Sequence, residues 1–446
     1  METKNKQNGA IIAIITMMFL FAMISFVTNL AAPFGLIWGN EYNWAGMMGN
    51  LMNFLAYLFM GIPAGKMLIN YGYKKTALIA LAVGVVGIFV QYLSSIVGSD
   101  TAVFSFQGQA VNLNFIVYLL GAFICGFCVC MLNTVVNPML NLLGGGGNRG
   151  NQLIQTGGTL NSLSGTLTPL FVGALIGQVS DKTAMSDVTP LLFIAMAVFV
   201  ASFFILFFIA IPEPQEKAES KGGFFEEIMA PLKFRHCMLG IIGIFFYVGI
   251  EIGIPSQLTF YLSKSAAEGG VGLENGAAIG GAIAAMYWML MLVGRFSSSL
   301  ISGKVSTRTQ MITVSITAIT LLIIAIFLPS SNTISMPGYS VSDGFSMFAV
   351  PAKCLFIVLC GLCTSVMWGG IFNLATEGLG KYTAIASGAF MTMVCGFAIM
   401  VGVQGLVADW TGSYLTSFWV PLACAAYILY YALIGSKNVN TDIKVD

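Results

Sequence analysis

Long apolar runs, separated by short polar stretches, follow one another along almost the whole chain. A helix needs about 20 predominantly apolar residues to cross the hydrocarbon core of a bilayer. Runs of this length predict twelve membrane-spanning helices, at 10–37, 45–69, 76–97, 113–143, 152–178, 189–211, 237–262, 274–302, 309–328, 353–373, 384–407 and 412–435. The pattern therefore predicts an all-α integral membrane protein.

Composition points to the lipid bilayer as the surroundings of this chain. Of its 446 residues, 57% are hydrophobic and only 8% are charged, whereas soluble domains carry about 25% charged residues. The net charge of +1 gives no polybasic or polyacidic signal, so we expect no nucleic-acid partner. The first apolar run follows Lys4 and Lys6 and is too long for the apolar segment of a signal peptide, which predicts a retained span.

Basic residues fix the expected orientation, because cytoplasmic loops of membrane proteins are enriched in Lys and Arg. With the N-terminus in the cytoplasm, the twelve spans leave three basic residues outside, Lys182, Lys264 and Lys353. The other sixteen fall inside, at Lys4, Lys6, Lys66, Lys74, Lys75, Arg149, Lys217, Lys221, Lys233, Arg235, Arg295, Lys304, Arg308, Lys381, Lys437 and Lys444. We therefore predict cytoplasmic termini and a place in the plasma membrane, the inner membrane of a bacterium.

The longest charged loop, 211–236, divides the chain into a bundle of six helices at 1–210 and another at 237–446. Its segment FFEEIMAPLKF fits either a short amphipathic surface helix or a solvated linker. The halves echo each other in three places: long polar loops at 98–112 and 329–350, glycine and cations in GIPAGKMLINYGYKK and GRFSSSLISGKVSTR, and Gly-x-x-x-Asp at Gly177/Asp181 and Gly405/Asp409. Together these echoes predict a parallel repeat that binds its substrate between the halves and rocks around it.

Candidate gating residues lie in the short cationic loops that follow spans two and eight. Gly65 and Lys66 lie at the first of these places, and Arg295 lies near the end of span eight. There Arg295 would pair with a carboxylate or cap helix carbonyls on the cytoplasmic face. The alternative is that these residues are ordinary anchors of the positive-inside kind.

Glu251 is the carboxylate that the sequence places deep inside a span. Fourteen residues after Cys237, it lies about 21 Å along its helix, near the bilayer midplane. Ionisable groups at that depth normally face a cavity or a partner. Tyr247 lies one turn earlier on the same face, while Gly249, Gly253 and Pro255 loosen the helix. We predict that Glu251 exchanges protons; the alternative is a structural acid held by hydrogen bonds.

Amides form a second group of polar side chains inside the spans. They are Asn29, Asn133, Asn137, Gln155, Asn161, Gln257 and Asn373. Amides make several directed hydrogen bonds without carrying charge, so a converging set suits a neutral polyhydroxylated ligand. The alternative is that each one joins two helices, at about 0.6 kcal/mol per bond.

Aromatic side chains are a third group of candidates. Trp288, next to Tyr287, and Trp368 fall inside spans, so a sugar could pack its apolar face on either indole. Trp38, Trp44 and Trp410 lie near span ends and fit an interfacial belt instead. Depth makes Trp288 the strongest of these ligand-facing candidates.

Cysteines give no sign of a metal or redox site. The chain has nine, mostly in apolar runs, and the CxxC within CGFCVC lacks a second pair of ligands. The chain's one histidine is His236. We expect buried thiols that behave as small apolar groups, and no metal.

Several of these segments resemble the fucose–proton symporter family, the sugar branch of the major facilitator superfamily. NTVVNPMLNLLG and LNSLSGTLTPLFVGALI are similar to its spans four and five. FYVGIEIGI is the most specific match, since many members carry Tyr-Val-Gly followed by an acid two residues later. GRF at 294–296 and EGLGKYTAIASG at 377–388 fit the later helices.

This resemblance implies a twelve-helix carrier of monosaccharides that is usually driven by protons and needs no cofactor. It also implies coupling acids in spans one and four, but the matching positions here are Asn29 and Asn133, which cannot titrate. Glu251 is the remaining acid, and it matches a Glu that many hexose-type members carry in span seven. The loss of the other two acids leaves sodium coupling, or no coupling, open.

We therefore expect a monosaccharide importer that works by alternating access, with an uncoupled sugar facilitator as first alternative. Efflux of amphipathic compounds would suit the 25 methionines, but the amide-rich spans favour a hydrophilic ligand. A receptor is disfavoured by the short tails, and an enzyme by the lack of a loop rich in Asp, His and Lys. The expected partners are the monosaccharide and the lipid bilayer, and we expect a monomer.

Overall fold

The computed structural model describes residues 2–42, 44–176, 183–211, 213, 224–340, 343–440, 442–443 and 445. Its helices are α1 (Glu2–Glu41), α2 (Met48–Leu93), α3 (Leu113–Leu143), α4 (Gly147–Ile176), α5 (Thr189–Phe208), α6 (Phe224–Met229), α7 (Arg235–Ser263), α8 (Gly276–Ile301), α9 (Thr307–Phe327), α10 (Lys353–Ala375), α11 (Thr383–Thr392), α12 (Gly396–Thr411) and α13 (Trp419–Tyr430). Its strands are β1 (Ala102–Phe106), β2 (Gln109–Asn112), β3 (Thr333–Ser340) and β4 (Gly344–Pro351).

Ten helical stretches in the described part are long and apolar enough to cross a membrane. One of them, α2, has 46 residues, which is about 69 Å if straight and twice the thickness of the hydrocarbon core. Gly72 interrupts it with a φ of 81° and a ψ of 175°, so α2 holds two of the predicted spans. The helix α4 lies where span five is predicted, and it is not among the ten stretches found in the described residues.

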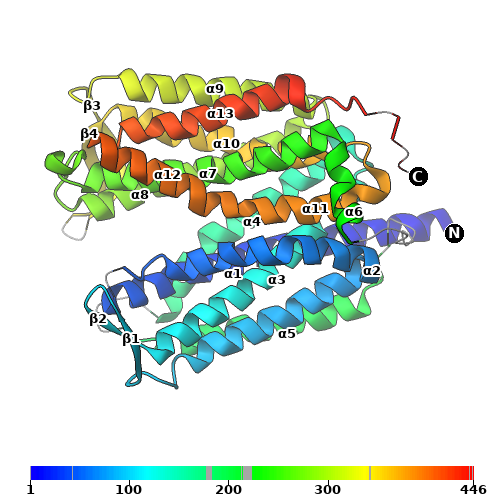
Figure 1. Cartoon of the computed structure of the whole chain (residues 1–446), viewed down its shortest axis with the longest axis horizontal. Coiled ribbons are helices and arrows are strands. Elements are labelled where there is room, and N and C mark those ends of the chain that lie inside the picture. The colour runs from blue at the N-terminus through cyan, green and yellow to red at the C-terminus, as the bar shows by residue number, and fades with distance from the viewer. Residues whose placement is uncertain are drawn as a thin grey trace.

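Helices α1 to α5 pack into one bundle and α7 to α13 into another, which we call the N-half and the C-half (Figure 1). Within the C-half, α10 packs against α7, α8 and α9, while α12 and α13 pack against α7. Helix α1 begins and α13 ends at one end of the molecule, the terminal end, and all four strands lie at the other, the hairpin end (Figure 1).

Two β-hairpins correct the all-α prediction. Each pairs two antiparallel strands, β1 with β2 and β3 with β4, and they occupy the loops 98–112 and 329–350 that the sequence marks as equivalent. The first turns through Gln107 and Gly108, which both have positive φ. Two consecutive residues with positive φ match the twist of the strands in a tight hairpin. The apolar and polar alternation around FQGQ was therefore a pattern from which this hairpin could have been predicted.

The predicted linker 211–236 is described only in part. Helix α6 occupies its second segment, and Glu213 reaches back to α2. The Glu213 carboxylate accepts hydrogen bonds from the backbone N–H groups of Tyr73 and Lys74, at 2.8 and 3.1 Å. It thereby caps the helix that restarts after Gly72. Gly177 and Asp181 lie outside the described residues, so their echo of Gly405 and Asp409 stays a prediction.

The two halves meet mainly through α2 with α11 and through α4 with α8 and α10. Gly65 lets α2 approach α11: a Cβ atom there would lie 3.0 Å from the Ala384 carbonyl oxygen and 3.1 Å from the Gly388 Cα atom. Lys66 follows in the same helix and is half-buried. These contacts lie in the terminal-end part of both helices, where the halves are closed together.

We predict that Gly65→Val lowers the unfolding temperature of the purified protein, because the added methyl groups must force α2 away from α11. Overpacking of this kind costs about 1–3 kcal/mol. Gly281→Val is the matched control, since a Cβ atom at Gly281 meets no atom within 4 Å. Equal unfolding temperatures for the two variants would show that the approach at Gly65 is not needed for closure.

Candidate functional site

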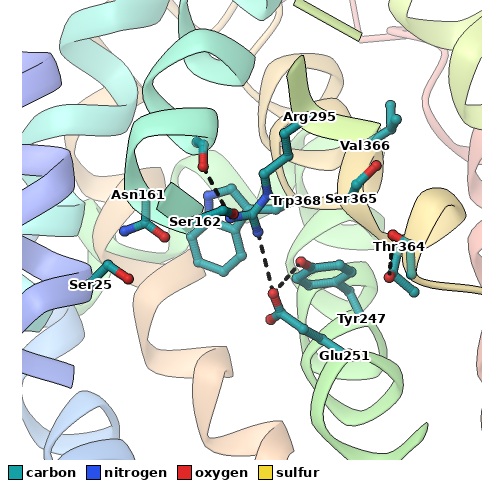
Figure 2. A network of polar contacts seen from close by, with 12 residues as sticks. Ser25, Asn161, Ser162, Tyr247, Glu251, Arg295, Thr364, Ser365, Val366 and Trp368 are labelled. Carbon is teal, nitrogen blue, oxygen red and sulfur yellow. Dashed lines mark hydrogen bonds and ion pairs between the residues drawn. The ribbon is translucent and has the colours of Figure 1, made fainter. Parts of the chain in front are cut away.

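Glu251 lies on the inner side of α7, between the two halves. It comes sixteen residues after the helix begins at Arg235, about 24 Å along the axis. Its Oε1 atom accepts a hydrogen bond from the Tyr247 hydroxyl at 2.7 Å and lies 3.3 Å from the Arg295 guanidinium (Figure 2). Its side chain is 16% exposed, and Oε2 has no hydrogen-bond donor among the described residues. The carboxylate is therefore paired but keeps one open oxygen.

Pro255 adds a second acceptor next to this carboxylate. A proline has no N–H group, so the backbone carbonyl of Glu251, four residues earlier, lacks its helical donor. The sequence predicts a helix loosened by glycines and proline here, and α7 runs without interruption from Arg235 to Ser263. Neighbouring helices hold it on both sides of the proline.

Arg295 joins the two halves. From α8 it pairs with Glu251 in its own half, and its other terminal nitrogen donates to Ser162 Oγ at 2.7 Å and to the Gly158 carbonyl oxygen at 3.3 Å, both in α4 (Figure 2). The residue is 8% exposed. Pairing with a carboxylate agrees with one of the two predicted roles, but Arg295 is not a loop cation, because it is buried where the helices cross.

A stripe of polar and small residues on α4 faces the C-half. Gln152 donates to the Ser299 carbonyl at 3.0 Å, and Gln155 donates to the Val366 carbonyl at 3.0 Å. Asn151 donates to Ser302 Oγ at 3.1 Å. Asn151, Gln155, Gly158 and Ser162 recur every three or four positions, which places them on one face of the helix, with Gln152 beside them. The polar face explains why α4 is less apolar than the other spans.

A second chain of hydrogen bonds enters from α2 and α3. The Asn133 amide donates to the Tyr57 hydroxyl at 2.9 Å, and the Asn137 amide donates to the Asn133 carbonyl at 2.9 Å. Trp368 of α10 donates its Nε1 hydrogen to Asn137 Oδ1 at 3.1 Å. The Trp368 ring then faces the Tyr247 ring, with 6.0 Å between centroids.

These contacts form one array, which we call the inter-half array. Its members all carry hydrogen-bonding groups and come from six helices: Tyr57, Asn133, Asn137, Ser162, Tyr247, Glu251, Arg295 and Trp368. Its only charges are Glu251 and Arg295. Such an array can bind a neutral polyhydroxylated ligand through hydrogen bonds and one aromatic ring, and it can exchange one proton at the carboxylate.

Several predicted ligand residues lie outside this array. Asn29 donates to the Ser25 carbonyl of its own helix at 2.8 Å, and Asn161 donates to the Phe21 carbonyl at 2.8 Å, so it joins α4 to α1. Gln257 is buried against α12, and its Oε1 atom has no hydrogen-bond partner among the described residues. Asn373 donates to Asn141 Oδ1 and to the Gly147 carbonyl, at 2.9 and 3.0 Å. It therefore ties α10 to α3 and α4 at the terminal end.

The two tryptophans that the sequence singles out have different positions. Trp368 belongs to the array, whereas Trp288 is 38% exposed at the rim of α8 and touches Tyr287 edge-on. Tyr287 points inward and shares a hydrogen bond with Thr364 at 2.8 Å. Trp38 is not a belt residue: it is 1% exposed, because the rings of Tyr42, Phe115 and Tyr118 cover it.

Sequence reasoning missed Ser162, Tyr57 and Asn141. Ser162 stands next to Asn161, and the helical period of the polar or glycine positions 151, 155, 158 and 162 was the signal that could have found it. Tyr57 and Asn141 lie in ordinary helical settings, and only their partners in other helices reveal them. Within the described residues, no group of three His, Cys, Asp or Glu side chains lies close enough to hold a metal ion.

We predict that Arg295→Gln destabilises the protein by about 3–5 kcal/mol, because it leaves Glu251 buried without its countercharge. The double variant Glu251→Gln/Arg295→Gln should be more stable than this single variant, since it removes both charges. Denaturant unfolding in detergent measures both values. A double variant as unstable as the sum of its parts would mean that the pair does not interact.

Comparisons with known proteins place the chain in a family. Residues 10–403 match the model of the Major Facilitator Superfamily. A glucose/galactose transporter of Brucella abortus is 27% identical over 98% of this chain and 97% of its own, and the L-fucose-proton symporter of Escherichia coli is 22% identical over 89% and 86%. The crystal structure of the E. coli fucose:proton symporter FucP covers 96% of this chain and all of its own, with a TM-score of 0.77 at 19% identity. Since the family model spans most of the chain, this protein belongs to the Major Facilitator Superfamily and is a membrane transporter rather than an enzyme.

Proposed function

We propose that this protein imports a neutral hexose or deoxyhexose together with a proton, by alternating access of the inter-half array to the two sides of the membrane. The observation that carries the proposal is the array itself: neutral hydrogen-bonding side chains of both halves converge on one carboxylate. Neutral donors and acceptors suit hydroxyl groups, and the Trp368 ring offers a flat surface for the apolar face of a sugar.

The names of two relatives support the substrate class. The Brucella abortus protein is a glucose/galactose transporter and the Escherichia coli protein an L-fucose-proton symporter. Both are related to this chain over most of its length. We therefore take glucose, galactose and fucose as the first substrates to test.

We further propose twelve spans, with cytoplasmic termini and a plasma-membrane location. Dividing α2 at Gly72 and adding the polar helix α4 raises the ten apolar stretches to twelve. The termini share an end with basic residues that include Lys66, Arg149 and Lys381, as the positive-inside rule requires. Closure at that end would then leave the array accessible from outside.

Glu251 is the proposed proton site, because its open Oε2 atom can take the proton while Oε1 stays bound. Asn29 and Asn133 carry no titratable group, and Asn133 is already bonded to Tyr57 and Asn137. We therefore assign proton coupling to a single acid, Glu251, in the C-half.

The decisive experiment is uptake of labelled glucose, galactose and fucose into liposomes that contain the purified protein. A pH gradient, a sodium gradient and no gradient are compared. Accumulation above the external concentration with the pH gradient alone supports a proton symporter. Equilibration to one level in all three cases would replace it with a facilitator, and no uptake of any sugar would remove the substrate class and favour amphipathic compounds.

We predict that Glu251→Gln abolishes accumulation driven by the pH gradient but retains exchange of labelled for unlabelled sugar. Glutamine keeps the shape and the hydrogen-bonding groups of the side chain but cannot titrate. Both reactions are measured in the same liposomes. Undiminished accumulation would assign the proton to another group.

We also predict that Trp368→Phe raises the sugar concentration at half-maximal exchange several-fold, because phenylalanine cannot donate to Asn137. Trp288→Phe is the matched control in α8 and should leave that concentration unchanged. The reverse result would assign the sugar contact to Trp288, as its depth in the sequence suggests.

A further inference from the structure

The guanidinium of Arg295 is shared between the two halves of the molecule. One terminal nitrogen lies 3.3 Å from Glu251 Oε1 in the C-half, and the other donates at 2.7 Å to Ser162 Oγ in the N-half (Figure 2). A guanidinium is planar and rigid, so both contacts are kept only while α4 and α8 hold their present positions. Arg295 therefore connects the Glu251 carboxylate to the N-half.

We propose that Ser162 is a positioning residue that links the protonation of Glu251 to closure of the two halves, acting through Arg295. This inference rests on the proposed function, since it assigns the element that makes a proton at Glu251 change the conformation.

The packing around Arg295 makes the link stiff. A Cβ atom at Gly294 would lie against Ser365 Oγ, so α8 touches α10 directly before the arginine. On the other side, a Cβ atom at Gly158 would lie 3.3 Å from Arg295 Cδ. Arg295 thus begins where α8 packs closely on α10, and its side chain packs against α4.

The effect of a proton follows from the charges that face Glu251. Among the described residues, the titratable groups near Glu251 are Tyr247 of α7 and Tyr287 and Arg295 of α8. The neighbouring helices α4, α10 and α12 present neutral side chains to this region, namely Ser162, Trp368, Met400 and Gln404. When Glu251 is ionised, Arg295 has a countercharge and binds α4. When Glu251 is protonated, Arg295 is a buried cation with only neutral acceptors, which is costly. Opening at the terminal end relieves this cost by admitting water.

This order of events is the one that a symporter needs, because protonation favours opening at the terminal end. A proton and a sugar that enter from the hairpin end weaken closure at the terminal end, and release of the proton there restores the pair. Neutral contacts such as Asn373 with Asn141 close the same end without responding to pH. The arginine link is therefore the pH-sensitive part of the closure.

The test replaces Ser162 by Ala, which removes the 2.7 Å bond and leaves the Glu251–Arg295 pair. Ser164→Ala is the matched control: Ser164 lies on the same helix, and its hydroxyl makes no hydrogen bond to a described residue. Ser162→Thr keeps the hydroxyl and should restore the original behaviour. We expect Ser162→Ala to lower the accumulation ratio about tenfold, the range for losing one hydrogen bond to a charged group.

A second readout does not depend on transport. Spin labels at Asn148→Cys and Lys304→Cys, both exposed at the terminal end of opposite halves, report the separation of the halves, and the nine native cysteines are buried or half-buried. We expect this separation to increase as the pH falls, and Ser162→Ala to shift the midpoint upward by about one pH unit. Ser164→Ala should match the unsubstituted protein, and Ser162→Ala should add nothing to Glu251→Gln.

Each result separates the two proposals. If Ser162→Ala and Ser164→Ala have the same midpoint, or if Ser162→Ala and Glu251→Gln act additively, the role of Ser162 is overturned while proton-driven uptake can still stand. If the separation never responds to pH but Ser162→Ala still increases it, the closing contact is supported and the link to the proton is overturned. A loss of stability alone, with an unchanged midpoint, would make Ser162 a packing residue.

Discussion

The structure depends on the need to keep one carboxylate and one guanidinium together in apolar surroundings. Neither Glu251 nor Arg295 is stable there alone, because removing an ionised group from water costs several kcal/mol. Pairing them brings α7 and α8 together, and the remaining donors of Arg295 draw in α4 from the other half. The ion pair itself lies within the C-half, and Arg295 carries its charge to the boundary with the N-half.

Around this pair, side-chain hydrogen bonds between described residues of the two halves join neutral groups. Amides and hydroxyls of α3, α4 and α10 bond across the boundary, and glycines such as Gly65 bring α2 and α11 close enough for backbone contact. Interhelical hydrogen bonds of this kind are individually weak in membranes. In the proposed alternating access, halves joined by many weak contacts could separate and close again, and the contact of Arg295 is the one that a proton on Glu251 would change.

The same features explain why the site sits on otherwise regular helices. Gly294 and Gly158 have no side chains, so α8 packs tightly on α10 and α4 and holds Arg295 in one place. Pro255 frees the Glu251 carbonyl without breaking α7. The hydrogen-bonding groups are therefore positioned by helix packing, while the two hairpins lie away from the array, at one end of the molecule (Figure 1).

The sequence by itself determined the membrane setting, the position of most of the apolar helices and the place of Glu251 deep inside one of them, because apolar length and a lone acid in an apolar run are local signals. The pattern in FQGQ was also local, although the hairpin it forms was missed. Only the tertiary structure decided the partners. The sequence places Arg295 with the cationic loops, yet in the structure it is buried against Glu251 and Ser162. Among the predicted ligands, Asn137 and Trp368 converge, whereas Asn373 and Gln257 turn to other helices. A side chain's partner depends on how helices cross, and periodicity records only which face it lies on.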